Sequence, residues 1–284
     1  MANTKKRLHF NTKAKKKDQF YTDPTIATRL VDLTVRALPE ERRRLLLEPA
    51  AGAGAFLVPM KNQGRAIGLD IEPKHGWVKE GNFLEIKASD LDIVNTSEVC
   101  VIGNPPFGFA ANLAVQFFNH AATMADTIAF IVPRTFRKAS VHNKLDKNFW
   151  LFYDDDVDKD AFIFRGETYD VPCCFQIWER KDRQRPKIEL EKSPLFTFTT
   201  PDQADFAVRR VGGRAGKTTD VVGTKVPSHY YIKANPSVGV IELRAMIDGL
   251  NFDREKSSTA GVNSVSKQEL VNKSNRERMT AIYL

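Results

Sequence analysis

Short apolar runs alternate with helix-like stretches through much of the chain. Each run has the length of a buried strand and is bounded by polar or small residues; the runs cover residues 45–48, 66–70, 98–103 and 127–132. Apolar positions recur at helical spacing over residues 24–38 and 111–124, and another helix is expected to begin near Ala53. This alternation predicts an α/β fold with a doubly wound, mostly parallel sheet that binds ligands at the carboxyl ends of its strands.

The pattern becomes less regular farther along the chain. Residues 149–153 and 171–178 are expected to form strands, and residues 161–165 are expected to form a loop beside the ligand cleft.

The C-terminal segment has turn, strand and helix signals of its own. Pro186 and Pro194 mark a boundary, after which residues 206–211 alternate between apolar and polar as a strand does. Ser266 with Glu269 three positions later is the pattern of a capping box at a helix start. We therefore expect a smaller, β-rich C-terminal module.

A bend rich in small residues follows the first predicted strand. That strand leads into Glu48 and then into a turn that contains Gly52 and Gly54, where glycine lets the backbone pass close to a ligand. The dinucleotide fingerprint GxGxxG is not matched, because its third glycine is missing. The next strand ends in Asp70, at the spacing where a carboxylate can accept hydrogen bonds from ribose hydroxyls. The segment beyond it supplies a polar and an aromatic side chain suited to bracketing an adenine ring: Asn82 and Phe83.

The turn Asn104-Pro105-Pro106-Phe107 follows the third predicted strand. The side-chain oxygen of Asn104 and the carbonyl of Pro105 can both accept hydrogen bonds from one planar amino group. The two prolines stiffen the turn, and the ring of Phe107 can stack on a flat heterocycle. The turn therefore predicts a socket for the exocyclic amine of a base. A Pro-Pro turn that merely ends a strand is the alternative.

Taken in order, these motifs resemble those of the Rossmann-like S-adenosylmethionine-dependent methyltransferases, and more closely those that act on adenine N6 in DNA. Residues 19–24 are similar to the leading motif of that group, which usually reads Thr-Pro-Pro; Asp23 stands where the first proline is usual. The resemblance covers residues 18–182. It implies a mostly parallel, seven-stranded sheet and S-adenosylmethionine as the cofactor.

The resemblance also implies two sets of functional residues. The glycine bend would border the methionine end of the cofactor, Asp70 would hold its ribose, and Thr22 would lie by its carboxylate. The implied cofactor-binding residues are Thr22, Glu48, Gly52, Gly54, Asp70, Asn82, Phe83 and Asn104. The implied catalytic residues are Asn104, Pro105, Pro106 and Phe107, acting on a flipped base. Similar turns occur in enzymes that methylate RNA adenine or guanine amines or a glutamine amide of proteins, and an inactive binding protein with this fold is a further alternative.

Charge is unevenly distributed along the chain, whose formal net charge is +8 at pH 7. Basic residues exceed acidic ones by seven in residues 1–17 and by six in residues 183–284, whereas acidic residues are in excess by five in residues 18–182. A nucleic acid is the partner that this distribution favours, because Lys and Arg beside phosphates release counterions. We expect a basic flexible arm, a methyltransferase domain and a nucleic-acid-binding or recognition module, with DNA favoured over RNA. A solvated tail is the alternative for the arm.

One basic turn in the C-terminal segment is the candidate contact with nucleic acid. Its basic residues are Arg209, Arg210, Arg214 and Lys217. The turn lacks the spacing of a phosphate-cradling loop, since only three residues separate its glycines. An exposed hairpin without special function is the alternative.

Other features exclude further classes. No apolar run approaches the ~20 residues that span a bilayer, and no apolar segment follows the basic start, so a cytoplasmic protein without membrane contact is expected. Cys100, Cys173 and Cys174 show no metal spacing and are expected to be reduced. The aspartates of residues 154–156 lack the glycine and closing Glu of a calcium loop, so no metal site is predicted. The oligomeric state is left open.

Overall fold

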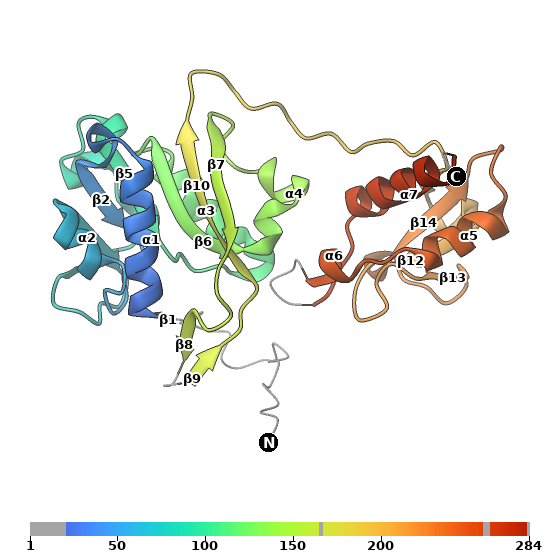
Figure 1. Ribbon diagram of the computed structural model, residues 1–284, viewed down its shortest axis with the longest axis horizontal. Helices are drawn as coiled ribbons and strands as arrows, with labels where there is room; N and C mark the ends of the chain where they lie inside the picture. The colour runs from blue at the N-terminus through green and yellow to red at the C-terminus, as the bar shows by residue number, and fades with distance from the viewer. Residues whose placement is uncertain (1–20, 165–166, 258–261, 283–284) are drawn as a thin grey trace. The chain divides into compact units, whose positions relative to one another are not determined.

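The computed structural model describes residues 21–164, 167–257 and 262–282 (Figure 1). The chain divides into two compact units, with the boundary between Lys187 and Ile188. Each unit has its own sheet and its own buried core. No helix of the described ranges combines the length and apolar character needed to cross a membrane.

The first unit is built on a seven-stranded sheet. In order across the sheet, its strands are β4 (Val78–Glu80), β3 (Ala66–Asp70), β2 (Leu45–Glu48), β5 (Val99–Gly103), β6 (Thr127–Pro133), β10 (Cys173–Arg180) and β7 (Phe149–Asp156). The strands from β4 to β6 pair in parallel, whereas β10 runs antiparallel to both neighbours. The predicted α/β fold with a mostly parallel sheet is confirmed.

Helices cover both faces of this sheet (Figure 1). Successive side chains of a strand point to opposite faces, so Leu45 and Leu47 pack on one side and Leu46 on the other. The first side is covered by α3 (Asn112–Ala121) and α4 (Ala139–His142), and the second by α1 (Pro24–Ala37) and α2 (Leu57–Gln63). Cys173 and Cys174, adjacent on β10, fall in the two different cores as free thiols.

Asp23 has a local role that accounts for the departure from the usual leading motif. Its carboxylate accepts hydrogen bonds from the backbone N–H groups of Thr25 (2.8 Å) and Ile26 (3.4 Å). Pro24 occupies the first turn of α1, where its missing N–H is not needed. Aspartate at this position therefore begins the helix.

A small three-stranded sheet stands beside the main one. It consists of β1 (Tyr21–Thr22), β8 (Phe162–Phe164) and β9 (Glu167–Tyr169). Residues 161–165 were expected to form a loop, but Phe162 and Ile163 pair antiparallel with Thr22 and Tyr21, and residue 165 lies outside the described ranges. The loop prediction is therefore wrong. The strand was not recognised because its pairing partner lies far away in the sequence.

The second unit is a four-stranded antiparallel sheet with helices packed on one face. Its strands, in order across the sheet, are β11 (Phe196–Thr199), β14 (His229–Ala234), β12 (Phe206–Arg209) and β13 (Thr218–Thr219). The helices are α5 (Val240–Gly249), α6 (Asp253–Ser257) and α7 (Lys267–Ile282). The predicted capping box is present: Ser266 N donates to the Glu269 carboxylate (2.7 Å) and Glu269 N to Ser266 Oγ (3.3 Å).

Short 3-10 turns complete the described chain. They comprise Glu40–Arg43, Phe83–Glu85, Ala88–Leu91, Thr96–Glu98, Phe109–Ala111, Arg134–Arg137, Pro201–Gln203 and Val226–Ser228.

Candidate active site

A pocket of about 380 Å³ opens at the carboxyl ends of β2, β3 and β5. This volume lies in the range of roughly 300–1,000 Å³ that is usual for small-molecule sites. The predicted site residues that line it are Thr22, Glu48, Gly52, Asp70, Asn82, Phe83, Asn104 and Pro106. Gly54, Pro105 and Phe107 lie within two positions of these residues in the sequence but are not part of the lining. The strand order therefore brings the two groups of motifs into one cavity.

The bend after β2 is tied to the end of β3. Gly52 has a φ of +46° and its N–H donates to Asp70 Oδ2 at 2.7 Å. A Cβ on Gly52 would lie 3.0 Å from the Tyr21 ring, so a side chain would crowd the pocket wall. Gly54 has a φ of +83°, which L side chains rarely adopt. Both glycines are needed for the shape of the bend.

Asp70 is held by two backbone donors. Gly52 N–H contacts one carboxylate oxygen, and Glu72 N–H donates to the other at 2.8 Å. Each carboxylate oxygen can accept a second hydrogen bond, so this arrangement fixes the orientation of the group and leaves acceptor capacity for a hydroxyl ligand.

Glu48 is a buried carboxyl group in the pocket wall, with 2% of its surface exposed. Burial raises its pKa well above the ordinary value of 4.5, the backbone of Leu57 and Phe56 lowers it, and the nearby Asp70 charge raises it. Oε2 has no hydrogen-bond partner among the described residues. A buried, unsatisfied carboxylate oxygen that faces a cavity is a good acceptor for a cationic donor on a ligand.

Asn82 and Phe83, which follow β4 in the sequence, also line the pocket. Asn82 Oδ1 accepts from Leu84 N–H at 3.2 Å, and Asn82 Nδ2 donates to Glu85 at 2.7 Å. The Phe83 ring is 1% exposed and lies edge-on to His120, with 4.9 Å between ring centroids. Both side chains are therefore fixed by neighbours in the first unit.

Asn104 is connected to the N-terminal part of the unit. Its Nδ2 donates to Thr22 Oγ1 at 3.2 Å. Pro105 is buried, and Phe107 is half-buried and packs against both cores of the first unit. The carbonyl of Phe107 also accepts from Leu113 N–H (3.2 Å), which joins the turn to α3. The turn is thus braced on several sides.

One feature beside the turn was not predicted from the sequence. Gly108, Ala110 and Ala111 all have positive φ angles, of +66°, +52° and +62°. For the two alanines, such a conformation costs roughly 1–3 kcal/mol each. Phe109, between Gly108 and Ala110, is 87% exposed. The only sign of this feature in the sequence was that a second aromatic residue, Phe109, follows Phe107 by two positions.

Arginine side chains pair with two of the aspartates of residues 154–156. Arg137 donates to Asp154 (2.8 Å) and Asp156 (2.5 Å), and Arg134 contacts Asp156 at 2.7 Å. These carboxylates are therefore neutralised by arginines. No group of three or more His, Cys, Asp or Glu side chains in the described ranges is arranged to hold a metal ion.

The four basic residues proposed for nucleic acid do not form one free surface. Arg209 and Arg214 are exposed. Arg210 is half-buried and lies over the Tyr230 ring at 5.3 Å. Lys217 donates its Nζ hydrogen to the backbone carbonyl of Asp248, so its ammonium is directed into the unit.

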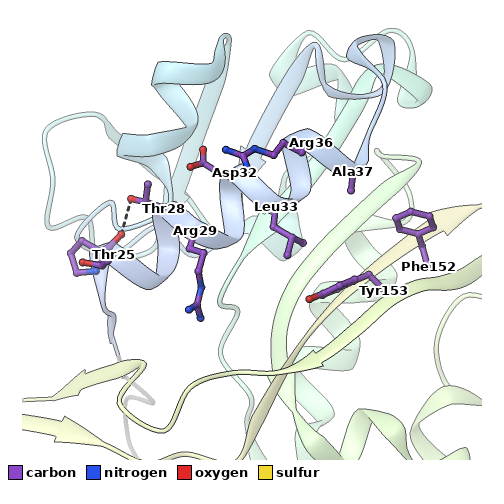
Figure 2. A pocket seen from close by; sticks show the side chains of 10 residues that line it. Thr25, Thr28, Arg29, Asp32, Leu33, Arg36, Ala37, Phe152 and Tyr153 are labelled. Atoms are coloured by element: carbon purple, nitrogen blue, oxygen red, sulfur yellow. Dashed lines mark hydrogen bonds between the residues drawn. The ribbon is translucent and has the colours of Figure 1, made fainter.

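A larger groove of about 1030 Å³ runs between α1 and β7 (Figure 2). It is lined by side chains that include Arg29, Asp32, Phe152 and Tyr153, and Figure 2 shows the hydrogen bond from Thr28 to the Pro24 carbonyl. None of the predicted site residues lines this groove. The chemistry expected from the sequence thus belongs to the smaller pocket.

Comparisons with known proteins found similar solved structures of low sequence identity. No family model matches the sequence. No curated protein matches it either. A Vibrio vulnificus protein assigned as a type I restriction enzyme modification subunit is 18% identical over 57% of this chain and 44% of its own, with a TM-score of 0.44. This chain therefore spans less than half the length of that subunit.

Two further solved structures have a similar identity and TM-score. A Pyrococcus horikoshii protein assigned as an RNA methyltransferase is 17% identical over 62% of this chain and 94% of its own, with a TM-score of 0.45. A Listeria monocytogenes protein assigned as a class I S-adenosylmethionine-dependent methyltransferase is 16% identical over 59% and 64%, also with a TM-score of 0.45. Because these identities and TM-scores are low, the activity has to be argued from the residues of the pocket.

Proposed function

We propose that this protein is an S-adenosylmethionine-dependent methyltransferase that acts on the exocyclic N6 amine of adenine in DNA. The observation that carries the proposal is that Asn104 lines the same pocket as the Gly52 bend, Glu48 and Asp70. A methyl donor and an amine acceptor must lie within reach of each other, and one cavity with both groups of residues fits that requirement.

The polar groups of the pocket fit S-adenosylmethionine. The unsatisfied oxygen of Glu48 suits the ammonium of the methionine end, and Asp70, fixed by Gly52, suits the ribose hydroxyls. Asn82 and Phe83 would border the adenine. When bound, this cofactor supplies an electrophilic methyl group on a sulfonium.

The turn would make a poor nucleophile reactive by orienting it. The N6 lone pair of adenine is delocalised into the ring, so the free amine attacks weakly. Asn104 Oδ1 and the Pro105 carbonyl would accept the two N6 hydrogens, favour a pyramidal nitrogen and direct its lone pair into the pocket. No strong base is required before attack, because the methylated amine is acidic and loses its proton readily. Orientation and electrostatics would supply most of the rate.

The base would have to leave the duplex to reach this turn. The ring of Phe107, half-exposed beside the pocket, would receive it by stacking. The basic excess in residues 1–17 and 183–284 favours a nucleic acid over a protein substrate. Exposed Arg209 and Arg214 are the better candidates for phosphate contacts within the basic turn, since Lys217 is bonded inside its own unit.

Transfer from labelled cofactor tests the proposal. The protein would be incubated with tritiated S-adenosylmethionine and DNA, RNA or a glutamine-containing protein, and modified nucleic acid digested to nucleosides. We expect label in N6-methyldeoxyadenosine. Label in RNA or in protein would instead support an RNA or a protein methyltransferase. Cofactor binding without methyl transfer to any substrate would favour an inactive binding protein.

Replacement of the turn's asparagine separates binding from chemistry. Asn104→Ala should abolish transfer and leave the affinity for S-adenosylmethionine nearly unchanged, because its amide would act on the substrate amine. Isothermal titration and the tritium assay measure the two quantities. A large loss of cofactor affinity would show that this division of roles is wrong.

A further inference from the structure

Phe109 is a large apolar residue that the fold leaves exposed beside the candidate active site. It is 87% exposed and lies in the loop between Pro106 and Leu113, both of which line the pocket. We propose that Phe109 is a wedge that enters the base stack of duplex DNA at the position that the target adenine leaves. This inference rests on the proposed function, and it gives Phe109 a role separate from that of Phe107, which would stack on the extruded base.

The backbone around Phe109 is held in an unusual conformation by the fold. Ala110 and Ala111 have φ angles of +52° and +62°, which L residues other than Asn and Asp rarely adopt. Ala111 is 1% exposed and packs in the core of the first unit. Before the loop, the Phe107 carbonyl accepts from Leu113 N–H at 3.2 Å, which closes the loop at its base. Phe109 is therefore presented to solvent from a support that is anchored on both sides, and such strain persists only where the surrounding structure enforces it.

An exposed aromatic ring on this loop suits the gap that base flipping creates. Extruding a base costs the duplex its stacking and pairing at that position. A phenylalanine that inserts between base steps restores part of the lost contact. Two residues span at most about 7 Å, so Phe107 and Phe109 can contact the extruded base and its former position together.

The charge of the surrounding segment is compatible with a close approach to DNA. Residues 99–125, which contain the turn and the loop, include no Asp or Glu. The loop therefore brings no negative side chain towards the phosphates, which would repel one.

Methyl transfer to duplexes and to single strands tests the wedge with the full-length protein. The substrates are a pool of synthetic DNA duplexes of random sequence and the same pool as single strands, so no recognition sequence has to be known. We expect Phe109→Ala to lower the apparent kcat/KM on duplexes about 10- to 100-fold, the size of base–aromatic stacking. The loss should be smaller on single strands, because no base pair has to be opened. The affinity for S-adenosylmethionine and the melting temperature should be unchanged.

Phe152→Ala is the matched control for this experiment. It removes a phenylalanine that is 55% exposed on β7, in the groove of Figure 2 and outside the pocket, and it should keep the activity on duplexes. An unchanged kcat/KM of Phe109→Ala on duplexes would overturn the inference, and so would an equal loss on duplexes and single strands.

A fluorescence readout does not depend on activity. An indole that stacks on a base loses emission, so the emission of Phe109→Trp should fall when the duplex pool is added. Phe152→Trp and the wild type should change little. If Phe109→Trp shows no additional quenching, or is quenched by a random RNA pool alone, the inference fails even where the wild type methylates DNA. If the wild type methylates no substrate, the proposed function fails, and quenching confined to Phe109→Trp still supports contact between Phe109 and the bases.

Discussion

Replacing Glu48 by Gln should stabilise the free protein and weaken cofactor binding at the same time. The amide keeps an oxygen for the backbone donors and removes a charge that is 2% exposed. Burial raises the folded-state pKa of Glu48, and each unit of that rise costs the ionised side chain about 1.36 kcal/mol, a cost that the neutral amide does not have. We expect a gain of that order in the free energy of unfolding. A hydrogen bond to a charged group is worth about 1.5–3 kcal/mol, so the Kd for S-adenosylmethionine should rise about 10- to 150-fold.

The effect on stability should depend on pH. The folded protein keeps the proton on Glu48 above 4.5, where the unfolded chain has already lost it, because the folded-state pKa is raised. The free energy of unfolding therefore falls as pH rises from 4.5 to the folded-state pKa, and the Gln variant lacks this contribution. Urea unfolding at several pH values and isothermal titration measure both effects.

A second carboxylate serves as the control. Glu98→Gln removes an exposed ion pair with Arg44 (2.9 Å), so it should lose at most about 1 kcal/mol and bind the cofactor normally. Our account of Glu48 would be refuted if Glu48→Gln were less stable than the wild type at neutral pH and bound the cofactor equally well.

Three further substitutions, one of them with a control at an exposed position, test the fold. Gly52→Ala places a Cβ on a residue with a φ of +46°, 3.0 Å from the Tyr21 ring. Thermal unfolding should therefore show a loss of about 1–2 kcal/mol in stability, and titration should show weaker cofactor binding. An unchanged melting temperature would contradict the expected backbone strain. Trp178→Ala empties a site that is 1% exposed and should lose about 3–5 kcal/mol in urea unfolding, whereas Val222→Ala, at 94% exposure, should change little. Ser266→Ala breaks the cap of α7 and should lose about 1 kcal/mol in the same assay, with methyl transfer to a short single-stranded substrate retained.

The central strands could be predicted because they are buried on both faces. Parallel strands between two helical layers appear in a sequence as mostly apolar runs. β2, β5 and β6 are buried at every position, and β3 is apolar up to Asp70. The edge strand β4 was missed because only Val78 of its three residues is buried. The second helix begins at Leu57 rather than near Ala53, because the positive φ angles of Gly52 and Gly54 are incompatible with a right-handed helix.

The convergence of motifs in one pocket followed from topology, but the contacts within it did not. Parallel strands end at the same edge, so Glu48, Asp70 and Asn104 could be expected to lie close together. The hydrogen bond between Thr22 and Asn104 joins residues that are 82 positions apart, and no local pattern encodes it. The inward direction of Lys217 likewise depends on the Asp248 carbonyl in a later helix. Local sequence gives the residue types, and tertiary pairing decides their orientation.

The three buried thiols make the protein a convenient background for spectroscopic labelling. Burial raises the pKa of Cys100 to about 12, and it raises the pKa of Cys173 and Cys174 as well, so little thiolate is present near neutral pH. Maleimide reagents should therefore leave the native cysteines unmodified. A cysteine introduced at Val222, or one in each unit, could carry a fluorophore or spin label without prior removal of any natural residue. Distances between the two units in solution could then be measured in a protein that keeps all three of its natural cysteines.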